Sequence, residues 1–289
     1  MPRLHHHLNI DEKSLLRECS GTFQLATQYL GWHRKGHDFF LGHGEHGANI
    51  GAINFNDLVT YQQQQGSDLR LEGFSAAALA ASLGRFSHPA QNKDNVLSTL
   101  DYALHVDTKA YRKFLMTLAK SLAVELMHGE VTHIKLNNDS GAIERLELDG
   151  GESVNADLFI DCSGSKATLI GKALSVAYRD WSDYLPCDRQ FVVPVEPRRS
   201  INPMSTIAAS AHGWIKQIPL REKTVFQYSF RKELSGSEDL VDSFQVLCGI
   251  NLKDFPKVRT VAPGCREHFW KRNCIALGAS AGHTDTVNQ

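Results

Sequence analysis

The densest run of potentially reactive side chains is Gly-His-Gly-Glu-His-Gly at residues 42–47. Its spacing matches the G-x-G-x-x-G pattern with which a strand-turn-helix binds the pyrophosphate of a dinucleotide. That function requires a buried strand before the glycines and a helix after them. The preceding apolar run is short, and residues 48–53 contain two β-branched residues and a further glycine. We therefore interpret the segment as a flexible glycine loop that carries ligand contacts.

The histidines raise the question of a metal site, because the chain has 14 of them. The densest group is His33, His37, His43 and His46. A zinc site needs three or four ligands on a rigid scaffold, usually with a cysteine or a carboxylate among them. No helical spacing fixes these four rings, and the six cysteines include no C-x-x-C pair. The sequence therefore predicts loop or surface imidazoles and no metal site.

Two segments place small residues directly after an apolar run, namely ADLFIDCSG at residues 156–164 and CIALGASAG at residues 274–282. Such runs are typical of strands that are buried on both faces of a parallel sheet. Small residues at the strand end allow a flat or phosphorylated cofactor to approach the backbone closely. They also allow plain packing of the strand against a helix, and the residues alone leave both interpretations open. The chain has no nucleophile elbow, Walker loop or H-E-x-x-H motif.

The elements that must position these segments are predicted from capping residues and apolar spacing. Asp11 and Asp107 are expected to cap helices, and the second helix is amphipathic and expected to pack on a sheet. The turn at residues 138–141 predicts a hairpin, and the short strands after residue 178 predict an antiparallel sheet that forms a second layer or subdomain. Further helices are predicted over residues 54–65, 75–83 and 237–247, and strands over 22–32, 131–137, 143–149, 191–195, 206–209, 214–219 and 224–230.

Composition excludes several classes of protein. The 289 residues carry 31 Lys+Arg against 32 Asp+Glu, and this balance argues against a nucleic-acid or anionic-membrane partner. Hydrophobic residues make up 42% and charged residues 22%, as in an ordinary globular protein. The sequence has no run of roughly 18 apolar residues and no apolar leader at its start. We expect a cytoplasmic protein with reduced thiols.

Several segments, in this order, resemble the flavin-dependent tryptophan halogenases: residues 102–107, 156–164, 181–189, 213–219 and 264–278. The resemblance runs from about Leu15 to Gly282. It implies a mixed α/β (α+β) fold of the FAD-dependent monooxygenase or halogenase type, with an inserted antiparallel substrate sheet. It also implies a chain truncated at both ends that lacks the N-terminal FAD-binding βαβ unit. The implied organisation is a substrate or tunnel-side segment (1–99), part of the flavin domain (100–177), the substrate sheet and a helix (178–260), and a truncated return to the flavin domain (261–289).

The resemblance further implies a reaction and its participants. Members of the family use reduced FAD, oxygen and halide to form hypohalous acid, which a tunnel delivers to a lysine beside an indole or similar aromatic substrate. A flavin reductase is the implied partner. The family positions fall on Ser163, Gly164, Gly278 and Gly282 for the cofactor, and on Leu41, His43, Gly44, Trp214, Ile218 and Pro219 for the substrate and tunnel.

The sequence departs from the family pattern where the chemistry takes place. Gln24 and Asn288 stand at the positions of the reactive lysine and of the glutamate that pairs with it, and Lys216 replaces the second tryptophan of G-W-x-W-x-I-P. An amide cannot carry an active halogen as a basic amine does. We therefore expect this chain to be inactive as a halogenase. A non-catalytic remnant or interaction module and a flavin-dependent aromatic monooxygenase stay open as alternatives.

Overall fold

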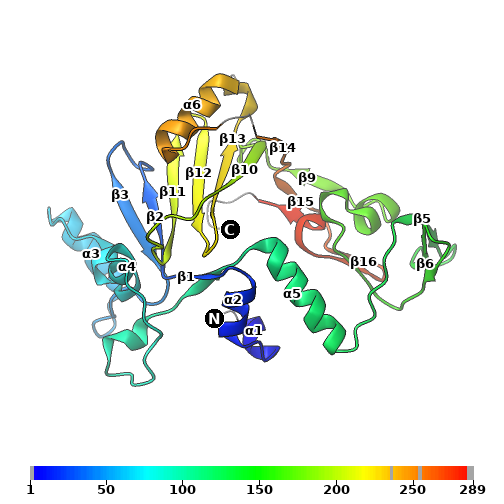
Figure 1. Ribbon diagram of the computed structural model, residues 1–289, viewed down its shortest axis with the longest axis horizontal. Coiled ribbons are helices and arrows are strands. Elements are labelled where there is room, and N and C mark those ends of the chain that lie inside the picture. Colours follow the sequence, from blue (N-terminus) through cyan, green and yellow to red (C-terminus); the bar gives the residue numbers. More distant parts are fainter. Residues whose placement is uncertain (1–2, 235–236, 253–255, 285–289) are drawn as a thin grey trace. The chain divides into compact units, whose positions relative to one another are not determined.

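The computed structural model describes residues 3–234, 237–252 and 256–284 (Figure 1). Two compact units share the chain. Unit 1 comprises Met1–Ala123, Phe191–Tyr228 and Ser237–Lys257. Unit 2 comprises Val124–Gln190, Ser229–Gly236 and Val258–Gln289.

Unit 1 is built around a twisted sheet in which the predicted antiparallel strands are present. The strand order is β10 (Arg189–Val195), β13 (Thr224–Phe230), β12 (Gly213–Pro219), β11 (Met204–Ser210), β2 (Ala26–Leu30) and β3 (Asp38–Gly42). β11 and β12 pair antiparallel, whereas β2 runs parallel to β11 (Figure 1). Strands from the first 42 residues extend this sheet, which the sequence analysis did not predict.

The single strand predicted over residues 22–32 is broken at Leu25. β1 (Thr22–Gln24) pairs with β4 (Ala103–His105), and β2 begins only at Ala26. The side chain of Leu25 is fully buried, its N–H donates to the carbonyl of Pro203, and its carbonyl accepts from the N–H of His43. The break turns the chain from one sheet to the other, and alternating apolar residues alone do not reveal it. The glycine loop predicted at residues 42–47 begins at the end of the edge strand β3, whose last residue is Gly42.

The predicted helices of unit 1 are present and capped as expected. Asp11 caps α2 (Glu12–Glu18) by accepting from the N–H of Ser14, and Asp107 caps α5 (Thr108–Ser121) through Ala110. The others are α1 (Arg3–His7), α3 (Phe55–Gln64), α4 (Ala76–Ser82), α6 (Ser237–Cys248) and the short turns η1 (Leu71–Phe74) and η2 (Val96–Thr99). None of the helices in the described ranges is long and apolar enough to cross a membrane.

The sequence had led us to expect the apolar stripe of α5 to pack on a sheet. It packs against the N-terminal helical segment, and Leu104 of β4 belongs to the same cluster. Leu15 and Cys19 of the α2 segment are fully buried and form one cluster with Tyr111, Phe114 and Leu118 of α5. The N-terminal helices therefore cover the stripe (Figure 1).

Unit 2 contains the predicted hairpin and the predicted parallel strand pair. β5 (Val131–Leu136) and β6 (Ile143–Leu148) pair antiparallel, and β8 (Phe159–Asp161) runs parallel to β17 (Cys274–Ala276) with Phe159 opposite Cys274. The expected burial of this pair on both faces was wrong, because Ile160 is 55% exposed. The remaining elements are β7 (Ser153–Val154), β9 (Tyr178–Asp180), β14 (Arg259–Thr260), β15 (Gly264–Arg266), β16 (Trp270–Lys271), β18 (Gly282–His283), and the turns η3 (Gly164–Lys166), η4 (Thr168–Ala173), η5 (Lys232–Leu234) and η6 (Gly278–Ser280).

Candidate functional site

A chain of buried hydrogen bonds surrounds Gln24 in unit 1. The amide nitrogen of Gln24 lies 3.2 Å from the hydroxyl of Thr27 and 3.3 Å from that of Ser205. The hydroxyl of Ser205 lies 2.8 Å from Nε2 of His105. Nδ1 of His105 lies 3.1 Å from the hydroxyl of Thr22. The break at Leu25 brings β1 beside β4 and so places Gln24 near His105, although they are far apart in sequence.

The proton order in this chain follows from its last acceptor. The hydroxyl of Thr22 donates to the carbonyl of Pro219 at 2.6 Å, so its oxygen accepts from Nδ1–H of His105. A neutral imidazole then has an acceptor at Nε2, to which Ser205 donates, and the oxygen of Ser205 accepts from Gln24. Every member of the chain thus has a partner.

Burial keeps His105 neutral. The pKa of His105 is lowered to about 3, mainly by desolvation and to a smaller extent by the charges of Lys216 and His43. An uncharged ring is the form that can donate at one nitrogen and accept at the other. His105 therefore neither gains nor loses a proton near neutral pH, and the hydrogen-bond chain from Gln24 to Pro219 stays uncharged there.

His43 is the group of this site that can meet a ligand. Its N–H donates to the carbonyl of Leu25 at 2.7 Å, which places its backbone next to Gln24. Burial lowers the pKa of His43, against a smaller opposing effect of Asp101. Among the described residues, nothing hydrogen-bonds to the buried Nε2 of this ring. A buried polar atom without a protein partner favours a bound molecule or water at that point.

Lys216 shares a sheet face with Ser205. Lys216 lies opposite Ile207 on the neighbouring strand, and Ser205 is two residues before Ile207, so the three side chains share one face. Lys216 is only 9% exposed. Trp214 and Ile218 lie two residues before and after Lys216 on β12, so their side chains share its face. Sequence reasoning noted Lys216 as a departure but did not connect it with His105.

The other predicted residues of unit 1 do not take part in the hydrogen-bond chain around Gln24. Leu41 lies opposite Thr27 on the edge strand and is 48% exposed. Gly44 has a φ of +86°, and an added Cβ would collide with the backbone carbonyl of Thr99, so its conformation explains the glycine. Asn288 lies outside the described residues.

In unit 2, two glycine turns meet where the parallel strands β8 and β17 end. Gly164 has a φ of +69° and Gly278 a φ of +64°, and no heavy atom lies within 4 Å of a Cβ built on either. The turns are held together because Leu277 N–H and Ser280 Oγ both donate to the carbonyl of Asp161. This leaves bare backbone at the carboxyl ends of two parallel strands, where α/β proteins bind flat or phosphorylated ligands.

The carboxylate of Asp161 fixes the first of these turns. It accepts from the N–H of Ser163 at 2.9 Å and from its hydroxyl at 2.6 Å, and from the N–H groups of Leu169 and Ile170 at 2.9 and 2.8 Å. Burial raises the pKa of Asp161, but these hydrogen bonds outweigh it and hold the pKa below its usual value. Ser163 is therefore oriented by Asp161, a residue that the sequence analysis did not single out.

A cavity of about 450 Å³ opens beside the glycine turns. Ser165 and Ala279, one from each turn, line it together with Arg259 and Arg266. Arg266 lies over the ring of Tyr178 at 5.1 Å and donates to the carbonyl of Val176. Within the described ranges, the buried Nε of Arg266 has no hydrogen-bond partner. The cavity therefore combines a guanidinium with open backbone, which fits an anionic, flat cofactor.

Two further sequence expectations concern unit 2 and metals. Gly282 lies in β18, where a Cβ would stand 2.6 Å from the carbonyl oxygen of Gly264, so close strand pairing accounts for this glycine. Across the described residues, no group of three or more His, Cys, Asp or Glu side chains is arranged to hold a metal ion.

The known proteins to which the chain is similar include tryptophan halogenases. A family model described as tryptophan halogenase matches residues 1–288. Tryptophan 6-halogenase SttH of Streptomyces toxytricini is 26% identical over 305 residues, which cover 97% of this chain and 57% of that protein. Tryptophan 7-halogenase RebH of Lentzea aerocolonigenes is 23% identical over 291 residues, which cover 95% of this chain and 54% of that protein.

Solved structures agree with these relatives. BrvH, a flavin-dependent halogenase from Brevundimonas sp. BAL3, superposes with a TM-score of 0.91 at 28% identity and covers 100% of this chain and 60% of its own. A flavin-dependent halogenase from Xanthomonas campestris gives a TM-score of 0.88 at 26% identity, with 98% of this chain and 56% of its own covered. The chain therefore spans less than two thirds of the length of these proteins.

Proposed function

The chain belongs to the tryptophan halogenase family, and from this premise we propose that it works in the flavin-dependent halogenation of an indole or similar small aromatic. The observation that carries the proposal is the pair of open glycine turns at the ends of β8 and β17, beside a cavity with Arg266. The mixed α/β fold with its inserted antiparallel sheet is that of flavin-dependent halogenases.

We assign the cofactor to unit 2. The backbone of Ser163, Gly164 and Gly278 would contact the flavin, because none of these turns has a side chain that blocks close approach. The guanidinium of Arg266 would pair with an anionic group of FAD. When bound, reduced flavin would supply two electrons to oxygen, and the partly reduced oxygen is the oxidant for halide. A flavin reductase is the partner that this chemistry requires. Both the reductase and the six free cysteines fit a cytoplasmic protein.

We assign the aromatic substrate to unit 1, at the face that carries Gln24, His43 and Trp214. The partnerless Nε2 of His43 would accept a hydrogen bond from a ring N–H, and the indole of Trp214 would contact the ring. The neutral chain from Ser205 through His105 holds the amide of Gln24 in one orientation. Both amide hydrogens are used, so Oε1 is the remaining hydrogen-bonding atom of Gln24 for a ligand.

The proposal includes impaired halogen transfer. The amide of Gln24 has no basic nitrogen, and His105, with a pKa of about 3, cannot serve as a general acid or base near neutral pH. We therefore expect slow halogenation or none by this chain, together with binding of FAD. The same observation favours a second candidate function, oxygenation of an aromatic by the flavin, which needs no amine at position 24.

Product mass tests the proposal. The chain is incubated with FAD, a flavin reductase, NADH, indole and bromide, and products are analysed by mass spectrometry for the bromine isotope pattern. Bromoindole that depends on the chain supports halogenation, whereas an oxygenated product in its place overturns it in favour of the second candidate. FAD binding with little or none of either product is the result that the amide at position 24 predicts, whereas absence of FAD binding would overturn the flavin assignment. A parallel reaction with the reductase but without the chain controls for oxidants that free reduced flavin produces.

A further inference from the structure

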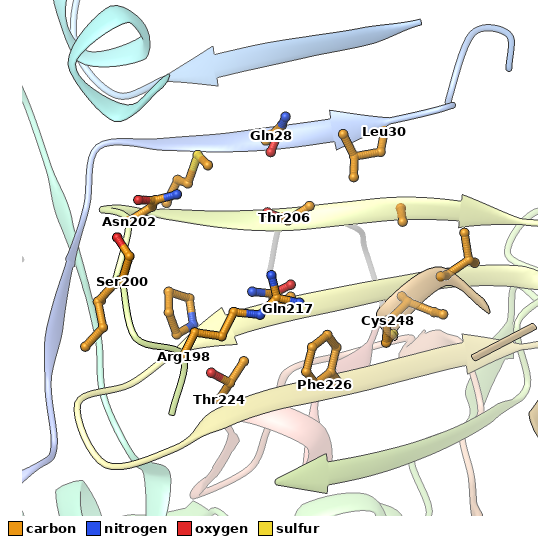
Figure 2. Close-up of a pocket in the computed structure, with 16 residues that line it drawn as sticks. Gln28, Leu30, Arg198, Ser200, Asn202, Thr206, Gln217, Thr224, Phe226 and Cys248 are labelled. Carbon is orange, nitrogen blue, oxygen red and sulfur yellow. The ribbon is translucent and has the colours of Figure 1, made fainter. Parts of the chain in front are cut away.

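We propose that the cavity on the opposite face of the unit 1 sheet is a second binding site, which takes a small monocarboxylate with an aromatic or branched apolar body. The cavity has a volume of about 460 Å³, within the range of small-molecule sites. It lies over the sheet face formed by β2, β11, β12 and β13, and the end of α6 lines it as well (Figure 2). The proposal does not rest on the proposed function.

The floor of this cavity is a row of hydrogen-bonding side chains across the strands. Thr206 lies directly opposite Gln28 on one side and Gln217 on the other, so the three side chains stand in line on one face (Figure 2). Thr224 of β13 adds a hydroxyl and is only 1% exposed. A sheet face that packs on a helix is ordinarily apolar, so a polar row at this place suits a ligand with polar groups.

The cavity also has one positive charge. Arg198 lines it, and Figure 2 shows its side chain extending towards Gln217. Arg198 is exposed at the cavity rim, and its charge opposes in part the burial that raises the pKa of the Cys248 thiol, another lining group, to about 12. None of the described lining residues is acidic. One guanidinium with neutral amides and hydroxyls matches a single carboxylate, which arginine binds through two parallel hydrogen bonds.

The remaining lining side chains are apolar and would hold the body of the ligand. Leu30, Ile215 and Phe226 come from the strands, and Leu247 comes from α6. Phe226 is fixed against Phe244 of α6 with ring centroids 5.8 Å apart. An apolar wall on one side and a polar row with a guanidinium on the other select a molecule that is apolar with one charged end.

This cavity is separate from the site around Gln24. On β12, Ile215, Gln217 and Pro219 line the cavity, whereas Trp214 and Lys216 alternate with them and point to the other face. The sheet itself therefore lies between the two sites. Nothing in the sequence motifs of the family draws attention to Arg198.

Binding of phenylacetate tests the proposal. The whole chain, labelled at its methyl groups, is titrated with phenylacetate and followed by NMR at Leu30, Ile215 and Leu247. We expect saturable shifts at these methyls. The affinity for the neutral analogue phenylacetamide should be lower by about tenfold or more, since this molecule lacks the charge that Arg198 would meet. Equal binding of the acid and the amide, or no saturable shift at millimolar phenylacetate, would overturn the proposal.

Two variants localise the effect. Arg198→Met should weaken phenylacetate by about tenfold, whereas Arg199→Met, which removes a neighbouring exposed arginine outside the cavity, should leave it unchanged. Identical affinities of the two variants would contradict the assignment of Arg198. If Arg198→Met fails to fold, the comparison of phenylacetate with phenylacetamide on the unaltered chain still decides the matter. Inorganic phosphate in the same titration should produce no shifts at the three methyls, because it has no apolar body.

Discussion

The amide nitrogen of Gln24 donates to the hydroxyl of Ser205 across 3.3 Å. Gln24 occupies the position at which the family resemblance expects a reactive lysine, and here its amide belongs to a closed set of hydrogen bonds that ends at the carbonyl of Pro219. The position is therefore structurally integrated in this chain. Changes to it should affect stability as well as ligand binding.

Ser205→Ala should destabilise the chain by about 1–3 kcal/mol, because it leaves Nε2 of the buried His105 without its donor and removes one of the two acceptors of the Gln24 amide. Urea denaturation measures this change. Ser200→Ala, at an exposed position on the preceding loop, is the control and should change the free energy of unfolding little. Equal stability of both variants would contradict the buried hydrogen-bond chain.

The stability of the chain should fall as pH is lowered from about 6.5 towards about 3 because of His105. Its pKa is lower in the folded state than in the unfolded state, so the unfolded state binds the proton in this window. The contribution is complete above pH 6.5 and is lost below it, with a slope of up to about 1.4 kcal/mol per pH unit.

Denaturation at several pH values checks this dependence. His105→Asn should show a shallower loss between pH 6 and pH 4, whereas the exposed His128→Asn should keep the slope of the unaltered chain. The remaining slope of His105→Asn should include a part from His43, whose pKa is lowered by burial in the same sense. An unchanged slope in His105→Asn would show that His105 is not neutral in the folded protein.

Gln24→Lys alone should not produce efficient bromination of indole. The new ammonium would lie near the charge of Lys216, and His105, with its pKa of about 3, cannot take up its proton. The longer, flexible lysine side chain would also replace the planar amide that donates to the hydroxyls of Thr27 and Ser205. Product mass in bromide buffer is the measurement, with the unaltered chain alongside. Robust bromoindole formation by this variant would show that position 24 is the only defect.

Asp161→Asn should destabilise unit 2 by about 2–3 kcal/mol, because the amide brings N–H groups towards backbone N–H donors that now meet a carboxylate. The folded pKa of Asp161 is held low, so its contribution is present above the unfolded value near 3.8 and disappears only as pH falls below it. Thermal unfolding at pH 7 compares this variant with Asp157→Asn, an exposed carboxylate four residues earlier. A similar small effect of both changes would rule out the organising role of Asp161.

Much of the fold follows from local chemistry in the sequence. Asp11 and Asp107 precede apolar stripes and do cap helices, and the turn at residues 138–141 does join two strands. The repeated apolar run followed by small residues correctly predicts that β8 and β17 belong together. These features depend on neighbours in the chain, which is why spacing reveals them.

The features that were missed depend on distant contacts. The break at Leu25 is stabilised by Pro203 and His43, and nothing in the alternation of residues 22–32 marks it. Ser205 meets His105 across 100 residues of sequence, so no local pattern connects them. Arg266 was present in a segment that resembles the family, yet only the cavity beside the glycine turns shows what its guanidinium could bind.

The assignment of flavin to the glycine turns of unit 2 is tested most directly by titrating FAD with the chain and following flavin fluorescence. We predict saturable quenching, weakened by about tenfold or more in a Gly164→Ala, Gly278→Ala double variant, since each Cβ would occupy open backbone at a left-handed φ. Gly150→Ala, where the same probe Cβ meets open space without a positive φ, should bind FAD like the unaltered chain. Absence of saturable quenching, or equal affinities of the double variant and Gly150→Ala, would contradict the account.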